Sequence, residues 1–574
     1  MPYSPEEIEP ALDRLLARMD ELEKRLSALE RRGATAPAAQ RLVPDSVAPH
    51  PVEQLSLARS AGAMPTVGKV FLGMAGAYLL RAGAQSAVLP KFAIVPIAMA
   101  HAGMWLIWAA RAHSRSTFSS GAYAVTASLI LSPMLWELTT DPGFQAIGLA
   151  LPPVVAAAVL VAFVLGASIL AWKDRLISVV WAPMAAASAT SLALMIATRD
   201  PAPFVLALFS IAVLAETAAE AGRWPLLRMI PALAADAAAL VLILVYTRAG
   251  GAPPEYRPAS AGVLLALFAA LFVIAALATL SQTVFLRRPI RYFDVTQTVL
   301  SFVIASVGVL RAGHESAATG LGIFCLAAAA GCYMLAFARF DGPANVREYH
   351  VFGAWAAALL VMGSVLSFSP EAQTTWLGLA ALGALVGSVR TERLTLAYDA
   401  LIFLFSAVLA SGALHYAGSL LAGSIPSAPR AMVWVAVAAV LLCYALAWRL
   451  AGDTWPRQAA RMAFAALTVF VGTALLVALI TRLAPAAFVL APPVLAAVRT
   501  LVICMAALAS AFAGARSQRA ELVWLAYTIM ALCTLKLGLE DLRAGSAVSL
   551  AFSLFFYGMA WVLAPRLARA GKKA

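Results

Sequence analysis

Apolar windows of about 20 residues follow one another from about residue 67 to about residue 563, and short polar or charged segments separate them. The hydrocarbon core of a bilayer is about 30 Å thick, and an α-helix needs roughly 20 residues to cross it. The alternation of polar and apolar positions that a membrane β-barrel requires is absent. The pattern therefore predicts an all-α, polytopic transmembrane bundle of about eighteen helices.

Composition and charge agree with a membrane protein and indicate its orientation. Hydrophobic residues make up 62% of the chain and charged residues 12%, which excludes an ordinary soluble domain. The net charge of +13 does not indicate nucleic-acid binding, because the basic residues follow the topology. Alternate loops and the C-terminal tail hold 22 Lys and Arg residues on one side, and the other side holds 10. The positive-inside rule then predicts a multi-pass membrane protein with both termini in the cytoplasm and membrane lipids as its surroundings.

The first 32 residues have a different, heptad pattern. Arg18 and Arg25 occupy g positions, and Glu23 and Glu30 occupy the e positions of the following heptads, as in parallel coiled coils. This predicts a cytoplasmic coiled coil over residues 1–32 and a homo-oligomer of undetermined order. The alternative is an amphipathic helix that lies on its own membrane domain. The apolar seam consists of Ile8, Leu12, Leu15, Met19, Leu22, Leu26 and Leu29.

Residues 33–65 are rich in Ala, Pro, Ser and Val, a composition typical of a linker. The helical part then divides, by the repeat described next, into a first unit over residues 66–295, a second over 296–520, and a closing hairpin with a basic tail over 521–574.

A short motif recurs at the predicted outer ends of three helices. "YLLRAG", "GVLRAG" and "CTLKLG" place a cation two residues before a glycine at Arg81 and Gly83, Arg311 and Gly313, and Lys536 and Gly538. The next helix in each case holds a glycine eight residues before an arginine: Gly103 and Arg111, Gly331 and Arg339, Gly558 and Arg566.

The spacing of this motif predicts a duplicated helix array. Arg311 follows Arg81 by 230 residues, and Lys536 follows Arg311 by 225. Each interval covers about eight helices, so the copies have the same orientation and form parallel repeats. The cations are predicted to be outer-interface anchors and the glycines turns into the next helix. The alternative is a chance match among Ala, Leu, Gly and Arg.

The order of these segments resembles a known family. "VGKVFLGMAGAYLLRAG" over residues 67–83 looks like its first membrane helix, and "LKLGLEDLRAGSAVSLAFSLFFYGMAWVLAPRL" over 535–567 looks like its closing hairpin. The family is the bacterial predicted-membrane-protein family catalogued as domain of unknown function 2339. Its members are usually longer, so this chain resembles a shortened or divergent member. The resemblance implies a location in the bacterial inner membrane and an array of membrane helices after a charged N-terminal segment. It transfers no catalytic residue.

Three ionisable residues fall inside predicted membrane helices: Asp236, His101 and Arg499. Each costs on the order of 2.5 to 3.5 kcal/mol near the bilayer centre, so each requires a partner or a function. If Asp236 faced His101 or water, it would bind a cation or relay a proton; the alternative is a hydrogen-bonded residue that orders helix packing. Water, or snorkelling of the side chain toward the interface, is expected to relieve the burial cost of the acidic residues nearer to helix ends, which are Glu216, Glu220, Asp294, Asp399 and Glu521.

Small residues and cysteines in the helices are interpreted as packing elements. Gly73 with Gly76, and Gly383 with Gly387, offer strips for close helix contact. The five cysteines contain no Cys-x-x-Cys pair, so no metal site or cofactor is predicted.

Signatures of soluble enzymes are missing from the sequence, including phosphate-binding glycine loops and His-Glu-x-x-His. The leading hypothesis is transport of a small solute or ion across the membrane. The alternative is a non-catalytic scaffold that oligomerises or recruits partners through the coiled coil. An intramembrane lipid-modifying enzyme is a more remote third hypothesis.

Overall fold

The structure is a computed structural model, and it divides into two units, residues 1–69 and 70–574. Nearly all of the residues that it describes belong to the second unit. The predicted coiled coil and linker, over residues 1–65, lie outside the described residues. Described are residues 66, 68–76, 78, 94–114, 116–142, 150–248, 250–313, 315–342, 345–422, 429–450, 452, 454–483, 492–541 and 547–570.

Helices account for all the regular structure of the described residues, and no strand occurs among them. Most are α-helices, and η2 and η4 are π-helical turns. In chain order they are α3 (Ile94–Ala112), α4 (Thr117–Thr140), α6 (Pro153–Trp172), α7 (Ile177–Ala197), α8 (Ala202–Glu220), α9 (Met229–Tyr246), α10 (Ala261–Leu280), η2 (Ser281–Phe285), α11 (Tyr292–Ala312), α12 (Glu315–Ala338), α13 (Val346–Ser367), α14 (Pro370–Thr391), α15 (Leu394–Ala410), α16 (Ala413–Ala422), α17 (Ala431–Ala447), α18 (Trp455–Leu483), α20 (Pro492–Arg516), α21 (Ala520–Lys536), η4 (Leu537–Asp541) and α23 (Ala547–Ala570).

Fourteen helices of the described part are long and apolar enough to cross a membrane. A fifteenth span results if α15 and α16, which are bent by 73° at their junction, are taken together. The shorter apolar helix α17 and the 19-residue helix α3 lie in the same series. The all-α, multi-pass membrane architecture is therefore confirmed, whereas the total of about eighteen helices stays a prediction.

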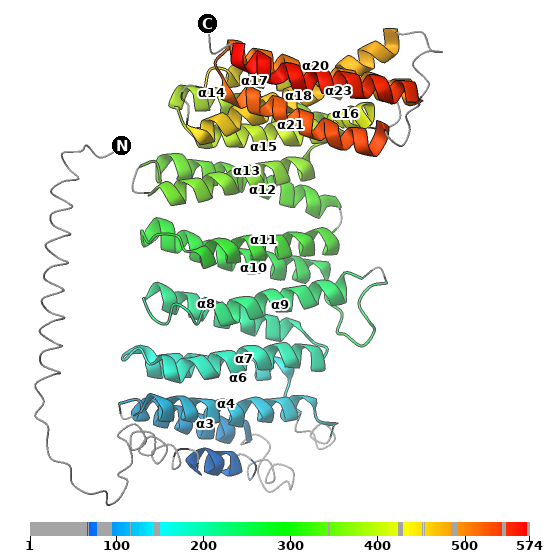
Figure 1. The fold of residues 1–574 in the computed structure, drawn as a ribbon. Helices are drawn as coiled ribbons and strands as arrows, with labels where there is room; N and C mark the ends of the chain where they lie inside the picture. The colour runs from blue at the N-terminus through cyan, green and yellow to red at the C-terminus, as the bar shows by residue number, and fades with distance from the viewer. Residues whose placement is uncertain are drawn as a thin grey trace, which may run out of the picture. The chain divides into compact units, whose positions relative to one another are not determined.

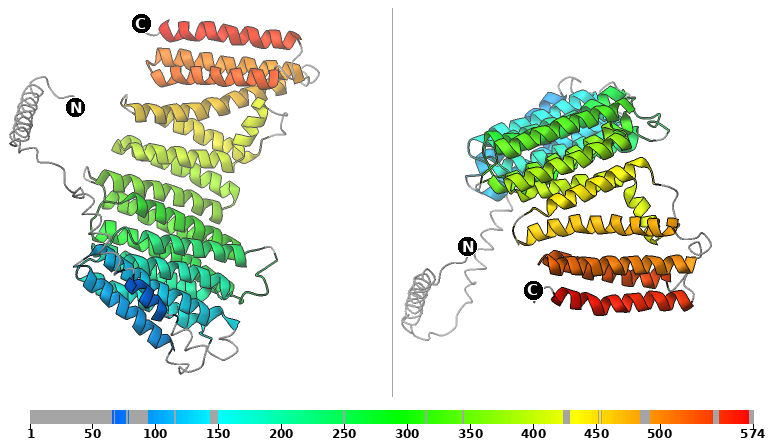
Figure 2. Two further views of the ribbon diagram at one scale, coloured as in Figure 1. Left: turned by 60° about the horizontal axis from the view of Figure 1, so that its bottom comes forward. Right: turned by 90° about the horizontal axis from the view of Figure 1, so that it is seen from above.

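Consecutive helices of the second unit pair as hairpins that stack in chain order (Figures 1 and 2). The pairs include α3 with α4, α6 with α7, α10 with α11, and α12 with α13. Contacts of α4 with α7, and of α9 with α11, join neighbouring pairs. This order follows from the short connections, since a helix that crosses the membrane returns beside its predecessor.

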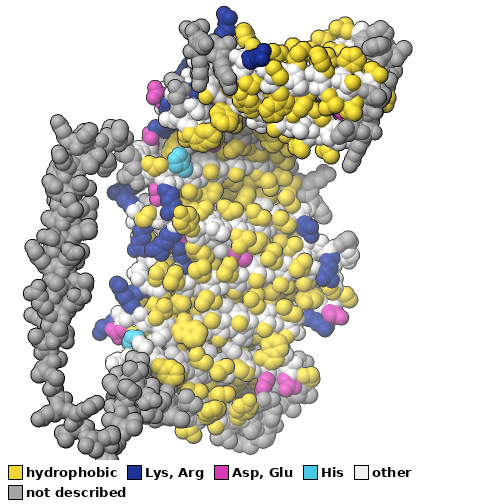
Figure 3. All heavy atoms as spheres, viewed as in Figure 1, with side chains coloured by type: hydrophobic (Ala, Val, Ile, Leu, Met, Phe, Trp, Pro, Cys, Tyr) yellow, Lys and Arg dark blue, Asp and Glu magenta, His cyan; other side chains and the backbone are white. Residues whose placement is uncertain are grey.

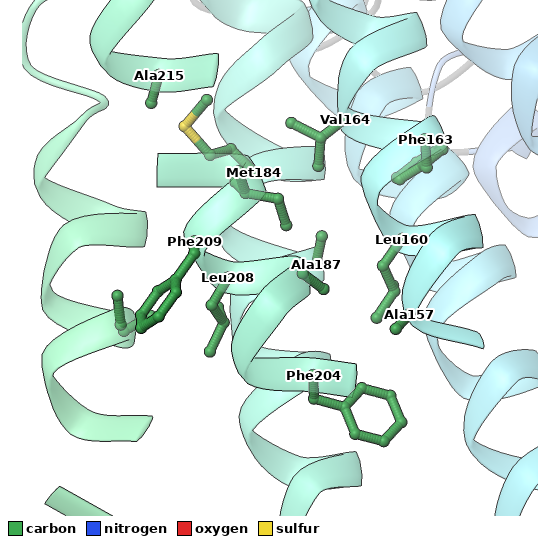
Figure 4. Close-up of a cluster of buried hydrophobic side chains, with 14 of the residues drawn as sticks. Ala157, Leu160, Phe163, Val164, Met184, Ala187, Phe204, Leu208, Phe209 and Ala215 are labelled. Atoms are coloured by element: carbon green, nitrogen blue, oxygen red, sulfur yellow. The ribbon is translucent and has the colours of Figure 1, made fainter. Parts of the chain in front are cut away.

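Alanine-rich faces fill the space between the stacked helices. In Figure 4, Ala157 and Leu160 of α6 lie near Ala187 of α7, and Phe204 and Leu208 of α8 belong to the same cluster. These five side chains are buried. Lipid tails are as apolar as leucine, so close packing of small against large residues, rather than expulsion of water, stabilises these contacts.

Charged side chains gather along two opposite edges of the visible face, and hydrophobic atoms cover the band between them (Figure 3). Many large apolar side chains of the membrane-spanning helices are exposed, for example Leu206, Ile169 and Val263. An apolar belt between two charged edges is the surface that a bilayer requires.

Among the described residues, the closest approach of a glycine to the backbone of another helix lies between α12 and α13. A Cβ added to Gly363 of α13 would lie 2.8 Å from the carbonyl oxygen of Gly322 in α12. Among the predicted strips, Gly73 lies against the Trp105 side chain, whereas a Cβ on Gly383 would have nothing within 4 Å. The Gly-x-x-x-Gly spacing in α14 therefore does not mark the closest approach, and Gly322 and Gly363 do.

We predict that Gly363→Ala lowers the free energy of unfolding by about 1 to 3 kcal/mol, because a methyl group at this position forces two backbones apart. The matched control is Gly383→Ala, which adds the same group in open space and should be neutral or slightly stabilising. Thermal unfolding of the two purified variants in detergent checks the difference, and equal midpoints would refute the close contact.

Candidate functional site

Asp236 lies in the middle of α9 and is 3% exposed. Gln297 Nε2 donates a hydrogen bond of 2.7 Å to its Oδ2 atom, and Ser301 Oγ donates one of 3.1 Å to Oδ1. Both donors belong to α11, one turn apart, and Gln297 also donates to Ser301 Oγ over 3.1 Å. Two neutral donors thus hold this carboxylate inside the contact between α9 and α11.

His101 takes part in a different contact. Its Nε2 atom lies 3.3 Å from the carbonyl oxygen of Gly73, which requires the proton on Nε2 because a carbonyl only accepts. α3 and α9 belong to different helix pairs, with α6 and α7 between them (Figure 1). Asp236 and His101 therefore have separate partners, and the structure does not bring them together.

The third predicted residue, Arg499 of α20, lies in a cluster of opposite charges. Arg499 Nη1 donates to Glu540 Oε1 over 2.6 Å, and Nε donates to the carbonyl oxygen of Leu420 over 2.7 Å. Lys536 Nζ donates to Asp541 Oδ1 over 2.5 Å, and Thr500 Oγ1 donates to Asp541 Oδ2 over 2.7 Å. We call Arg499, Thr500, Lys536, Glu540 and Asp541 the charged junction.

The charged junction balances its charges away from water. Arg499 is 2% exposed and Asp541 is 1% exposed. Two cations face two carboxylates, so the net formal charge is zero. Burial of an ion is costly, and only close geometry and additional hydrogen bonds repay that cost. Lys536 meets this condition, because its Nζ atom also donates to Ala496 O and to Thr500 Oγ1, each over 2.7 Å.

Irregular backbone surrounds the charged junction on two sides. Glu540 and Asp541 lie in the π-helical turn η4, which continues α21. On the other side, Arg499 contacts the carbonyl oxygens of Ser419 and Leu420 near the C-terminal end of α16. α16 is the second half of the helix pair that is bent by 73°. A cation at this position satisfies carbonyl groups that lack a partner within the helix and offsets the negative end of its dipole.

The recurring motif has different surroundings at the positions that the structure describes. Arg311 is exposed, and Gly313 directly follows the end of α11. Lys536 is about one-tenth exposed and bonded within the protein, and Gly538 lies inside η4. Lys536 therefore differs from the predicted interface anchor, because Asp541 offers a buried partner. Arg81 and Gly83 lie outside the described residues.

Several acidic residues that were expected to reach water at helix ends are instead buried and paired. Asp294 accepts from Arg228, which also pairs with Glu216 over 3.1 Å. Glu521 pairs with Arg461 over 2.6 Å. Asp399 accepts a hydrogen bond of 3.0 Å from Tyr333 Oη, and Glu220 accepts one from Ser281 Oγ. The expectation was wrong for Asp294, Asp399 and Glu521, because neighbouring helices rather than water supply the partners.

The sequence offered no strong signal for these partners. Gln297, Ser301 and Thr500 are neutral residues in apolar runs, and Arg228 and Arg461 look like ordinary cytoplasmic loop cations. One contact of Asp294 did have a signal in the sequence. Its carboxylate accepts from the backbone N–H of Arg291, three residues earlier, over 3.0 Å. An acidic residue at the third position of a helix is a recognisable N-terminal signal.

Metal ligation has no candidate among the described residues, because no group of three His, Cys, Asp or Glu side chains comes together there. The closest pair of thiols is Cys504 and Cys533, whose Sγ atoms lie 4.0 Å apart between α20 and α21. The five cysteines are free.

Comparison with protein-family models, with curated proteins and with solved structures finds no match to this chain. The resemblance to the family of domain of unknown function 2339 stays a prediction.

We predict that Asp236→Asn folds with nearly unchanged stability, because a reoriented Gln297 amide is able to pair with the new one. Asp236→Leu leaves Gln297 and Ser301 without their buried acceptor and should lower the free energy of unfolding by about 1 to 3 kcal/mol. Thermal unfolding in detergent separates the two variants. Equal stability of Asp236→Leu and the wild type would show that Asp236 has no role in packing.

Proposed function

We propose that the protein transports a small inorganic cation, protons included, and that the charged junction is the site that handles it. One observation carries this proposal: four ionisable side chains meet where a bent helix pair and a π-helical turn come together. Ionisable groups inside a membrane commonly belong to ion pathways. Interrupted helices and π-turns build binding sites in many membrane proteins.

Glu540 is the member of the charged junction at which a cation would bind. Its Oε1 atom accepts from Arg499, but Oε2 lies 3.5 Å from Lys536 Nζ and has no hydrogen-bond donor among the described residues. Its side chain is 21% exposed, whereas that of Asp541 is 1% exposed and accepts two hydrogen bonds. The Oε2 atom is itself buried, so Glu540 is the carboxylate of the charged junction that keeps a hydrogen-bonding position open inside the protein, where a bound cation would be held.

Binding at Glu540 would affect the bent helix pair through Arg499. The same guanidinium holds Glu540 and the carbonyl oxygens of Ser419 and Leu420. A cation that competes for Glu540 weakens one of these contacts and shifts the balance of the others. This supplies a two-state element whose equilibrium the ligand biases.

A scaffold is the second candidate, and the surroundings of Asp236 favour it. The carboxylate is closed by Gln297 and Ser301 and separate from His101, so the region first expected to conduct is packed instead. In this version the helices anchor the chain, and the predicted coiled coil over residues 1–32 joins copies or recruits partners. For both versions we propose a bacterial inner membrane and cytoplasmic termini.

Ion flux through purified protein tests the transport proposal. Proteoliposomes that contain the pH dye pyranine receive an imposed gradient of Na⁺ or K⁺, with and without a protonophore that lets protons compensate for uncoupled metal-ion movement, and the change in internal pH is recorded. We expect flux above that of empty liposomes, a reduction of about tenfold or more in Glu540→Gln, and no change in Asp236→Asn, the matched control. Thermal unfolding confirms that both variants fold.

Absence of flux in the wild type, together with a cellular function that is lost on deletion of residues 1–32, would contradict transport and support the scaffold. Equal flux in Glu540→Gln and the wild type would contradict the assignment of the site.

A further inference from the structure

A groove of about 670 Å³ lies between the ends of α6, α8 and α10, on the side of the loop 247–260. Its walls include Val154, Leu165, Leu206 and Val263, which are large apolar side chains between 43% and 62% exposed. Its floor includes the buried Leu242. The groove is therefore open at the apolar belt, toward the position of lipid chains, and its size lies within the range of small-ligand sites.

Alanines on one face of α6 create the hollow. Ala158 and Ala162 are exposed and line the groove, and the lining of α6 extends from Val154 to Leu165. The twelve residues from Val154 to Leu165 are separated by eleven helical steps, a rise of about 16 Å, which is close to half of the roughly 30 Å hydrocarbon core. The groove thus runs about the depth of one leaflet, from the interface inward.

Most polar groups of the groove lie at its interfacial end. Along its walls, the polar lining residue is Ser210. Arg257 Nη1 donates to Asp200 Oδ2 over 2.9 Å, and Tyr246 Oη donates to the carbonyl oxygen of Arg257 over 2.7 Å. These bonds fix the loop over the end of the groove. The groove consequently has an apolar body and a defined polar head.

A second cavity of about 310 Å³ adjoins this head. Tyr246, Pro258 and Leu264 line both cavities. The second cavity also includes Arg248 and Arg311, which are exposed, and no acidic residue. Its charge is therefore positive, next to the mouth of an apolar groove.

We infer that these two cavities form a binding site for an anionic phospholipid from the leaflet on the side of the loop 247–260. An acyl chain lies in the groove against Ala158 and Ala162, and the phosphate lies between Arg248 and Arg311. Guanidinium groups are well suited to phosphate because they donate paired hydrogen bonds. A soluble anion would leave the groove unfilled, and an uncharged lipid would leave the positive charge of the two guanidinium groups uncompensated, although Arg248 Nε also donates to the carbonyl oxygen of Leu244 over 2.8 Å.

The site assigns a role to Arg311 that the recurring motif alone does not. Arg311 lies in the last turn of α11, and it lines the second cavity together with residues of the loop that follows α9. A lipid phosphate between Arg248 and Arg311 would bridge the α8–α9 and α10–α11 pairs. This role is independent of ion transport at the charged junction.

Native mass spectrometry of the full-length protein tests the site. The purified protein in detergent is titrated with phosphatidylglycerol and, separately, with phosphatidylcholine. We expect one phosphatidylglycerol to bind at least about tenfold more tightly than phosphatidylcholine, a difference of about 1.4 kcal/mol. The double variant Arg248→Gln with Arg311→Gln should remove this preference. The matched control is Arg430→Gln, which removes an exposed arginine predicted to lie on the same side but outside both cavities.

A second pair of variants tests the groove. Ala158→Trp fills it and should weaken binding of both lipids, whereas Ile169→Trp adds the same side chain on an exposed part of α6 outside the groove and should have no effect. Thermal unfolding confirms the fold of each variant. An unchanged preference in the double arginine variant, or equal lipid binding in Ala158→Trp and Ile169→Trp, would overturn the proposal. Binding of inorganic phosphate that withstands Ala158→Trp and replaces the lipid would also overturn it.

Discussion

Hydrocarbon offers no hydrogen bonds, so every polar group that enters the membrane region requires a partner from the protein. This constraint explains the positions of the buried charges. Asp236 accepts from two donors of α11, and Arg499 bonds to Glu540 and to the end of α16. On the predicted cytoplasmic side, Arg228 holds Asp294 and Glu216. The contacts of Asp236 with Gln297 and of Arg499 with Leu420 join helices whose bonded residues are 61 and 79 positions apart. The polar residues therefore fix which helices meet, while alanines and glycines set how closely they pack.

The sequence was sufficient for the class of fold, because runs of 20 apolar residues have few alternatives in a bilayer. It also located Asp236 and Arg499 as buried groups that need an explanation. It could not supply their partners. Gln297 is 61 residues from Asp236, and an amide in an apolar run has no pattern that indicates a contact at that distance. Asp294 and Glu521 were expected to contact water because they lie near helix ends. The position of a residue along its helix does not reveal that another helix covers that end.

The buried charge at Asp236 and the charged junction differ in how readily their hydrogen-bond partners could exchange. Around Asp236, one carboxylate meets neutral donors, and the contact is complete. At the charged junction, two cations and two carboxylates share a small volume beside a π-helical turn, and exchange of partners among them requires only small movements. Lys536 belongs to the recurring motif, yet its surroundings differ from those of Arg311. The proposed functions of these two cations, one at an ion site and one at a lipid site, follow from that difference.

Arg499 and Glu540 stabilise the fold as a pair within the membrane region. A double-mutant cycle with Arg499→Met, Glu540→Gln and the combined variant measures their coupling directly through the free energy of unfolding in detergent. Each single variant leaves one charge without its partner, so the account predicts a favourable coupling energy of about 2 kcal/mol, near the upper part of the range for contacting residues. Additive effects of the two substitutions, with coupling near zero, would contradict it.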